Sequence, residues 1–177
     1  MDLCKKDFIR ALLAELLELA PDAVYWGYQS NPKQRGAYAV LNLFARRQEA
    51  PPEWRPVGPG KVQVWTPMAA TLSVTLADTP DPSSDLEHLA SRLGSPSVVE
   101  KCAAAGVAFY ASEMVQDVSV LDTRAHKRAA LDFSVRWTHS DIDDVGYIDQ
   151  VEANGRYPGS ADGDNDIHKV VISGRLE

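Results

Sequence analysis

The strongest constraint on the fold is a run of alternating residues in the second half of the chain. From Ala129 to Thr138, five apolar side chains alternate with five others, four of which are polar. The apolar residues are Ala129, Leu131, Phe133, Val135 and Trp137. A period of two places each set on one face of an extended strand. The sequence therefore predicts a half-buried strand whose apolar face lies in the core.

The segment before this strand is its expected pairing partner. Val107–Val118 is rich in residues that favour strands, although it has apolar side chains on both faces. The stretch from Asp122 to Arg128 is too polar to lie in a core. We therefore predict a hairpin over Val107–Trp137, on which the other elements pack.

An amphipathic helix is predicted at the start of the chain. Leu3–Leu19 repeats apolar residues at helical spacing, which gives one broad apolar stripe. Asp2 is placed to cap this helix, and Pro21 is expected to end it. A short strand over Val24–Tyr28 and a turn over Ser30–Gly36 are expected to follow.

Two short helices are predicted ahead of the hairpin. Ser84 and Glu87 have the spacing of a capping box, for a helix that ends at Gly94. The same spacing recurs just after Pro96, for a helix that ends at Gly106.

Further strands complete the predicted pattern. They are Ala37–Ala45, Lys61–Trp65, Ala69–Ala77, Val145–Val151 and Lys169–Leu176. A turn at Thr66-Pro67 is expected to separate the second from the third. The order of elements predicts an α+β fold with a mainly antiparallel or mixed sheet, flanked by an N-terminal helix and two short helices.

The stretch Arg46–Gly60 shows neither a helical nor a strand period. Its four prolines, at positions 51, 52, 56 and 59, exclude a helix or a central strand. We predict a long loop, which in a compact domain is usually functional or mobile. Trp54 lies inside it and is expected to find a partner surface.

Charge is unevenly distributed along the chain. The net charge is −7, and residues 140–177 hold nine acidic and three basic residues. A general attraction to nucleic acid is therefore not indicated. The acidic tail can serve solubility, and its three clustered aspartates suit either a turn or a cation.

A basic segment precedes the acidic one. Six basic residues lie between Lys33 and Lys61, and an ordinary charged loop would also explain them. Because opposite charges set orientation in assembly, we predict that the two segments meet between identical subunits. The predicted interface residues are Lys33, Arg35, Arg46, Arg47, Trp54, Arg55, Asp141, Asp143 and Asp144.

Patterns of catalytic and metal sites are missing from the sequence. It has no nucleophile elbow, phosphate-binding glycine loop or dinucleotide fingerprint. Cys4 and Cys102 lack metal-site spacing, as do the four histidines. The run Asp162–Asp166 misses the glycine and glutamate of a calcium loop, because Ile167 and Ser173 stand at those positions. We expect no catalysis, no cofactor and no metal.

The N-terminal sequence has no apolar signal region, and no apolar run reaches transmembrane length. We therefore expect no membrane association and a reducing cytoplasm as the place of synthesis.

Taken in order, these features resemble the neck or tail terminator proteins of tailed phages. The resemblance covers roughly residues 3–152. It rests on the Leu-rich helix and on Arg35–Leu43, Thr75–Leu76, Asp85–Leu93, Ala105–Ala108, Val115–Ser119, Arg128–Phe133 and Asp144–Ile148. Two features depart from the family pattern: no glycine ends the strand before the second helix, and residues 153–177 are additional. We assign residues 1–152 to a terminator-like α+β domain and 153–177 to an acidic loop and strand that extend it.

The resemblance implies a structural protein rather than an enzyme. Terminator proteins form a ring, usually sixfold, that caps the tail tube, stops its growth and faces the head connector. The implied partners are further copies of the chain, the tail tube and sheath proteins, and the connector or adaptor protein. Genome DNA would pass through the lumen without specific binding. The implied location is the virion neck, with the host cytoplasm as the place of assembly.

Two alternatives stay open at this point. One is another head-completion or connector protein, and the other is a small cytoplasmic enzyme with a dispersed site.

Overall fold

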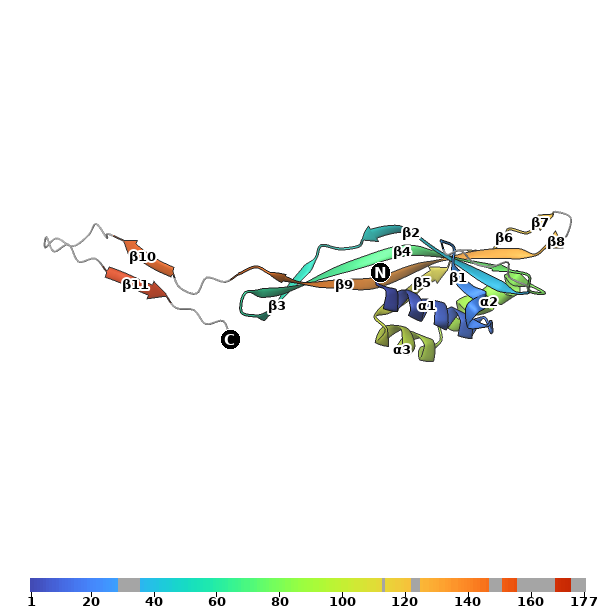
Figure 1. The fold of residues 1–177 in the computed structure, drawn as a ribbon, viewed down its shortest axis with the longest axis horizontal. Helices are drawn as coiled ribbons and strands as arrows, with labels where there is room; N and C mark the ends of the chain where they lie inside the picture. Colours follow the sequence, from blue (N-terminus) through green and yellow to red (C-terminus); the bar gives the residue numbers. More distant parts are fainter. Residues whose placement is uncertain (29–35, 113, 122–124, 147–150, 156–167, 173–177) are drawn as a thin grey trace. The chain divides into compact units, whose positions relative to one another are not determined.

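The structure is a computed structural model that describes residues 1–28, 36–112, 114–121, 125–146, 151–155 and 168–172 (Figure 1). The chain divides into two units. The first holds Met1–Pro52 and Trp65–His139, and the second holds Glu53–Val64 and Ser140–Glu177.

Three helices belong to the first unit. They are α1 over Leu3–Leu16, α2 over Pro82–Leu93 and α3 over Pro96–Ala104. All three lie on the same face of the sheet, and no helix of the described residues lies on its other face (Figure 1).

The end of α1 differs from the prediction, because the helix stops well before Pro21. Glu18 adopts a left-handed conformation with φ of 56°. Its N–H donates to the carbonyl of Glu15 at 3.3 Å, and the N–H of Leu19 donates to that of Ala14 at 3.0 Å. These two bonds form a Schellman motif, which satisfies the last carbonyls and ends the helix. Pro21 instead begins a 3-10 helix.

The predicted N-cap of α1 is confirmed. The backbone N–H of Lys5 donates to Asp2 Oδ1 at 2.8 Å, and its ammonium group lies 2.7 Å from Oδ2. The hydrogen bond from the Lys5 side chain, together with that from its backbone, holds the pKa of Asp2 below its ordinary value.

We expect the substitution Asp2→Ala to lower the free energy of unfolding by about 1 kcal/mol at pH 7. Because the folded-state pKa lies below the unfolded one, this stabilisation is complete above the unfolded pKa and is lost as the pH falls through the folded pKa. Urea unfolding at neutral and acid pH would show the difference between wild type and variant shrinking in acid. Leu3→Ala, an exposed substitution in the first turn of α1 that removes no titrating group, is the control, and its effect should be equal at both pH values.

The start of α2 also differs from the prediction. Asp81 caps this helix by accepting a hydrogen bond from the backbone of Ser84 at 3.3 Å, so Ser84 is not the cap. The proline after Asp81 suits the first helical position because it has no N–H to lose. Gly94 follows the end of α2, and Pro96 begins α3, as predicted. Gly106 lies just past the end of α3 with φ of 65°.

The main sheet has seven strands. Their bounds are β1 Val24–Trp26, β2 Tyr38–Gln48, β3 Glu53–Gly58, β4 Lys61–Ala77, β5 Val107–Ser112, β6 Gln116–Asp117 and β9 Arg128–Asp144. The order is β1-β2-β4-β9-β5, with β3 paired to β4 and β6 to β9. β1 is parallel to β2, whereas the pairs β2–β4, β5–β9 and β6–β9 are antiparallel. The predicted α+β class with a mixed sheet is confirmed.

Two small antiparallel pairs lie outside this sheet. β7 (Val120–Leu121) pairs with β8 (Ala125–His126), and β10 (Val151–Gly155) pairs with β11 (His168–Ile172).

The predicted hairpin is confirmed, with a shorter first strand. β5 pairs with β9 so that Val107 lies opposite Trp137 and Phe109 lies opposite Val135. The rest of the predicted first strand contributes only the short β6, and β9 itself continues past Trp137 to Asp144. All five apolar residues that the alternation assigned to the core are at most 5% exposed.

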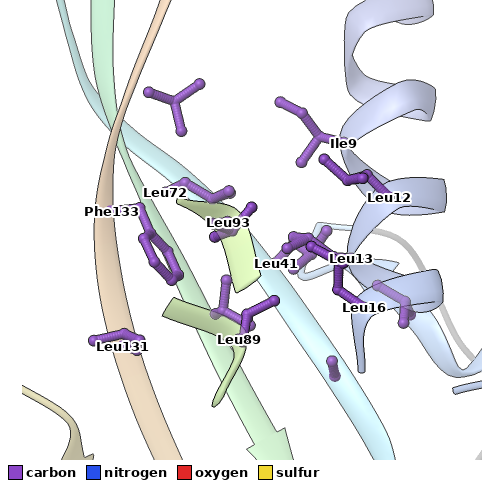
Figure 2. Packing of buried hydrophobic residues seen from close by; sticks show 14 of the residues in the cluster. Ile9, Leu12, Leu13, Leu16, Leu41, Leu72, Leu89, Leu93, Leu131 and Phe133 are labelled. Carbon is purple, nitrogen blue, oxygen red and sulfur yellow. The ribbon is translucent and has the colours of Figure 1, made fainter. Parts of the chain in front are cut away.

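The hydrophobic core of the first unit lies between the helices and the sheet. Figure 2 shows Leu13 of α1 and Leu89 of α2 pointing toward Leu41, Leu72 and the strands beside them. These side chains are at most 1% exposed. Fully burying a leucine contributes roughly 1.5–3 kcal/mol, so this layer is the main source of stability.

The predicted loop over Arg46–Gly60 is wrong in most of its length. β2 continues through Arg46 to Gln48, and β3 occupies much of the rest. Pro56 is tolerated because β3 pairs only with β4 among the described strands. No second neighbouring strand needs a hydrogen bond from the N–H that this proline lacks. Gly60, with φ of 67°, lies in the turn that joins β3 to β4.

The predicted turn at Thr66-Pro67 is also wrong, since β4 runs unbroken through both residues. Pro67 lacks an N–H but keeps its carbonyl in the ladder, where it accepts a hydrogen bond from Glu49 N at 3.0 Å.

Several predictions concern the C-terminal part of the chain. Val145 and Gly146 follow β9 without strand structure, contrary to the predicted Val145–Val151 strand. β11 contains the first half of the predicted Lys169–Leu176 strand. Residues 30–35 of the predicted turn and the run Asp162–Asp166 lie outside the described residues.

Candidate interaction surfaces

The second unit contains strands with exposed apolar side chains. β3 and the beginning of β4 belong to it, as does the end of β9, and no helix among its described residues covers them. Trp54 on β3 is 66% exposed and Ile142 on β9 is 67% exposed, and Val57 and Val145 are exposed as well. Exposed large apolar residues that gather on few strands are typical of surfaces that bind other proteins.

The basic residue predicted beside Trp54 is exposed too. Arg55 forms a salt bridge with Glu53, with 2.9 Å between Nη2 and Oε2. Both side chains are mostly exposed, and pairs of this kind contribute about 0–1 kcal/mol to stability.

The three predicted aspartates lie within β9 and not in a turn or at a strand entrance. Asp141, Asp143 and Asp144 belong to its last residues, in the second unit, and all three are exposed. The strand continues here because β4 remains beside it, as the hydrogen bond from Val145 N to Gly60 O at 2.9 Å indicates.

Arg46 and Arg47 lie on β2 in the first unit, and both are exposed. The register of β2 against β4 shifts between Phe44 and Arg47, and Ala45 has φ of 50°. This is a β-bulge, which inserts one residue and twists the strand locally. Burial lowers the pKa of the Met1 amino group, and the positive charge of Arg46 lowers it further.

The predicted basic segment is therefore divided between the two units. Arg46 and Arg47 belong to the first, whereas Arg55 and Lys61 belong to the second. Lys33 and Arg35 lie outside the described residues. Whether these residues form an interface remains a prediction.

Sequence reasoning missed a cluster on the helix-free face of the sheet. Arg136 on β9 forms a salt bridge with Glu49, with 2.7 Å between Nη2 and Oε1. Its guanidinium carbon lies 4.3 Å from the centroid of the Tyr110 ring, which is a cation–π arrangement. The alternation in β9 placed Arg136 on this face, but only the register of β5 and β9 shows that Tyr110 lies beside it.

Hollows in the first unit differ in lining, and one of about 430 Å³ is lined mainly by polar residues that include Asp117, Lys127 and Arg128. Another of about 270 Å³ is lined mainly by apolar groups of Pro67, Met68, Val107 and Trp137. Burial raises the pKa of the Cys102 thiol, which favours its unreactive form. Across the described residues, no three His, Cys, Asp or Glu side chains are grouped as a metal site.

None of the helices in the described part of the chain combines the length and apolar character needed to span a membrane.

Comparison with known proteins places the chain in a family. No curated protein matches it. Residues 6–160 match the family model described as phage neck terminator protein, and this range contains α1 from Lys6 onward, α2, α3 and the seven-stranded sheet. The resemblance drawn from the sequence is thereby confirmed. The chain belongs to the phage neck terminator family, and its role is that of a structural protein of the phage neck.

Proposed function

We propose that this protein forms a ring that caps the tail tube in the phage neck and joins it to the head connector. The observation that carries this proposal is the family match over residues 6–160. The partners would be further copies of the chain, the tail tube and sheath proteins, and the connector or adaptor protein. Genome DNA would pass through the lumen without specific contacts, and assembly would take place in the host cytoplasm before the ring becomes part of the virion.

A closed ring needs two different surfaces on each subunit, because its contacts are head-to-tail. The exposed arginines at 46 and 47 and the exposed aspartates at 143 and 144 are suitable surfaces of opposite charge. Such pairs contribute little each, so they bias encounter and orientation rather than hold the ring. The exposed Trp54 is a candidate for the affinity, since buried aromatic anchors dominate interface energies.

Charge reversal at the basic surface tests the ring. We expect R46E/R47E to slow ring formation more than it weakens finished rings, because long-range attraction acts mainly on encounter. Sedimentation velocity at low and high salt would measure assembly, and thermal melting would confirm that the monomer stays folded. R10E/K101E, which makes the same change of net charge on α1 and α3, is the matched control.

If the rate of ring formation changes neither with salt concentration nor in R46E/R47E, the electrostatic part of the proposal is wrong. The terminating role needs a separate assay, in which the ring is added to polymerising tail tube protein. Tubes that keep growing beside a ring that binds the connector would favour the alternative head-completion role.

A further inference from the structure

Among the described strands, the last residues of β9 have a partner on one side only. Over Ser140–Asp144, β4 is that partner, and the pair closes at the hydrogen bond between Val145 N and Gly60 O. On the opposite side, the pairing with β5 begins at Trp137 and covers only residues before it. No described strand lies beside residues 140–144 there. We call this stretch the acidic edge.

The second half of β2 has the same property. Residues 42–48 pair with β4, from Asn42 opposite Ser73 to Gln48 opposite Met68. On its other side β1 covers only Ala39–Leu41, and no other described strand of the sheet follows. We call residues 42–48 the basic edge. A strand edge of this kind is a template for pairing with another chain.

The two edges carry opposite charges. Arg46 and Arg47 lie on the basic edge, and Asp143 and Asp144 lie on the acidic edge, all four exposed. Each edge therefore repels a copy of itself and attracts the other, because like charges on facing strands destabilise pairing and opposite charges stabilise it.

Charged residues on an edge often serve only to prevent pairing. These two edges differ from that case because each also exposes a large apolar side chain next to its charges. Phe44 is 47% exposed on the basic edge, and Ile142 is 67% exposed on the acidic edge. Preventing strand pairing does not explain why these exposed side chains are apolar. Pairing with a second strand would give Phe44 and Ile142 an apolar neighbour each.

We propose that copies of this chain join edge to edge, with the acidic edge of one copy pairing with the basic edge of the next. The inference rests on the proposed ring and names the contact that builds it. The sheet then continues from one subunit to the next through main-chain hydrogen bonds, as in strand addition to an exposed edge. Two different edges of the same chain meet, so the contact is head-to-tail and can close into a ring.

A complementary pair of variants tests the contact. R46E/R47E has two acidic edges, and D143R/D144R has two basic ones. Each alone should form rings at least about tenfold more slowly than wild type, because like charges then meet at every contact. An equal mixture should assemble nearly as wild type does, because the two variants can alternate around the ring with every edge meeting its opposite.

The control variants reverse exposed charges on the helices. R10E/K101E and E87R/E100R change the net charge by the same amounts and leave both edges intact. Each should assemble alone as wild type does, and mixing them should bring no gain. Thermal melts of all four variants establish that each is folded.

Amide hydrogen exchange of the wild-type protein is the second measurement, and it needs no variant. On assembly, the amides of residues 42–48 and 140–144 that point away from β4 should exchange about tenfold or more slowly, because strand pairing protects backbone N–H groups. Amides of the buried strand β1 should not change. Rescue by mixing together with protection of both edges supports the contact.

Three results would overturn the inference, and they differ from one another. If each variant alone forms rings as readily as wild type does, the edge contact is contradicted, but the proposed ring is not. Rescue by mixing without amide protection shows that the charges guide assembly while the edges stay unpaired. A wild-type chain that is monomeric in every condition, including with tail tubes, removes the proposed ring itself.

Discussion

Phe133→Ala is expected to lower the free energy of unfolding by about 3–5 kcal/mol, the range for a buried phenylalanine. Phe133 is 3% exposed on β9, and its ring meets that of Phe109 edge to face, with centroids 6.3 Å apart. Figure 2 shows the ring directed from β9 into the core layer that also contains Leu72 and Leu93. Truncation would remove these contacts and leave a cavity in the middle of the layer. Urea unfolding followed by circular dichroism measures the loss.

Ser134→Ala is the matched control, because Ser134 is the next residue on the same strand and lies on the opposite face. It should change stability by no more than about 0.5 kcal/mol, as most surface substitutions do. A loss below about 1 kcal/mol for Phe133→Ala would contradict the register of β9.

Leu13→Ala should cost about 2–5 kcal/mol, for a related reason. Leu13 is fully buried where α1 packs on the sheet, and it points toward Leu41 (Figure 2). Leu3→Ala on the same helix is the control, since Leu3 is exposed and its truncation opens no cavity. Both changes are leucine to alanine in α1, so helix propensity affects them alike and the difference reports packing. Equal losses in the two variants would mean that α1 does not dock through this face.

The parts of the fold that the sequence predicts correctly are those in which side-chain period reports burial directly. The alternation in β9 identified all five of its buried apolar residues. The apolar stripe of α1 and the cap at Asp2 are also local features, readable within a few turns of helix.

The errors arise where local signals depend on neighbours far along the chain. A proline interrupts a strand only where a neighbouring strand needs a hydrogen bond from the missing N–H. The sequence does not show that β3 has one partner among the described strands, nor that the carbonyl of Pro67 stays hydrogen-bonded. The end of α1 was missed because Glu18, rather than a glycine, adopts the left-handed conformation there.

The candidate surfaces also combine features that the sequence predicts correctly with features that it does not. Exposure of Arg46, Arg47 and the clustered aspartates follows from their charge, and the structure has them exposed. The pairing of Glu49 with Arg136 was not predicted, because it depends on the register between distant strands. The strand edges on which the charges lie depend equally on which strands are neighbours.

The bulge in β2 inserts one residue beside its two arginines and so changes which face of the sheet the side chains after it point to. As it stands, Phe44 lies opposite Thr71 and Arg47 opposite Ala69, so both point to the helix-free face. Removing Ala45 would restore strict alternation: Arg47 would stay opposite Ala69, whereas Arg46 would lie opposite Ala70, which is buried on the core side. A relative with a one-residue gap at this point would therefore need an apolar residue in place of Arg46. Such a gap, found in an alignment of the family, would mark members that have exchanged a charge on this strand for a larger core.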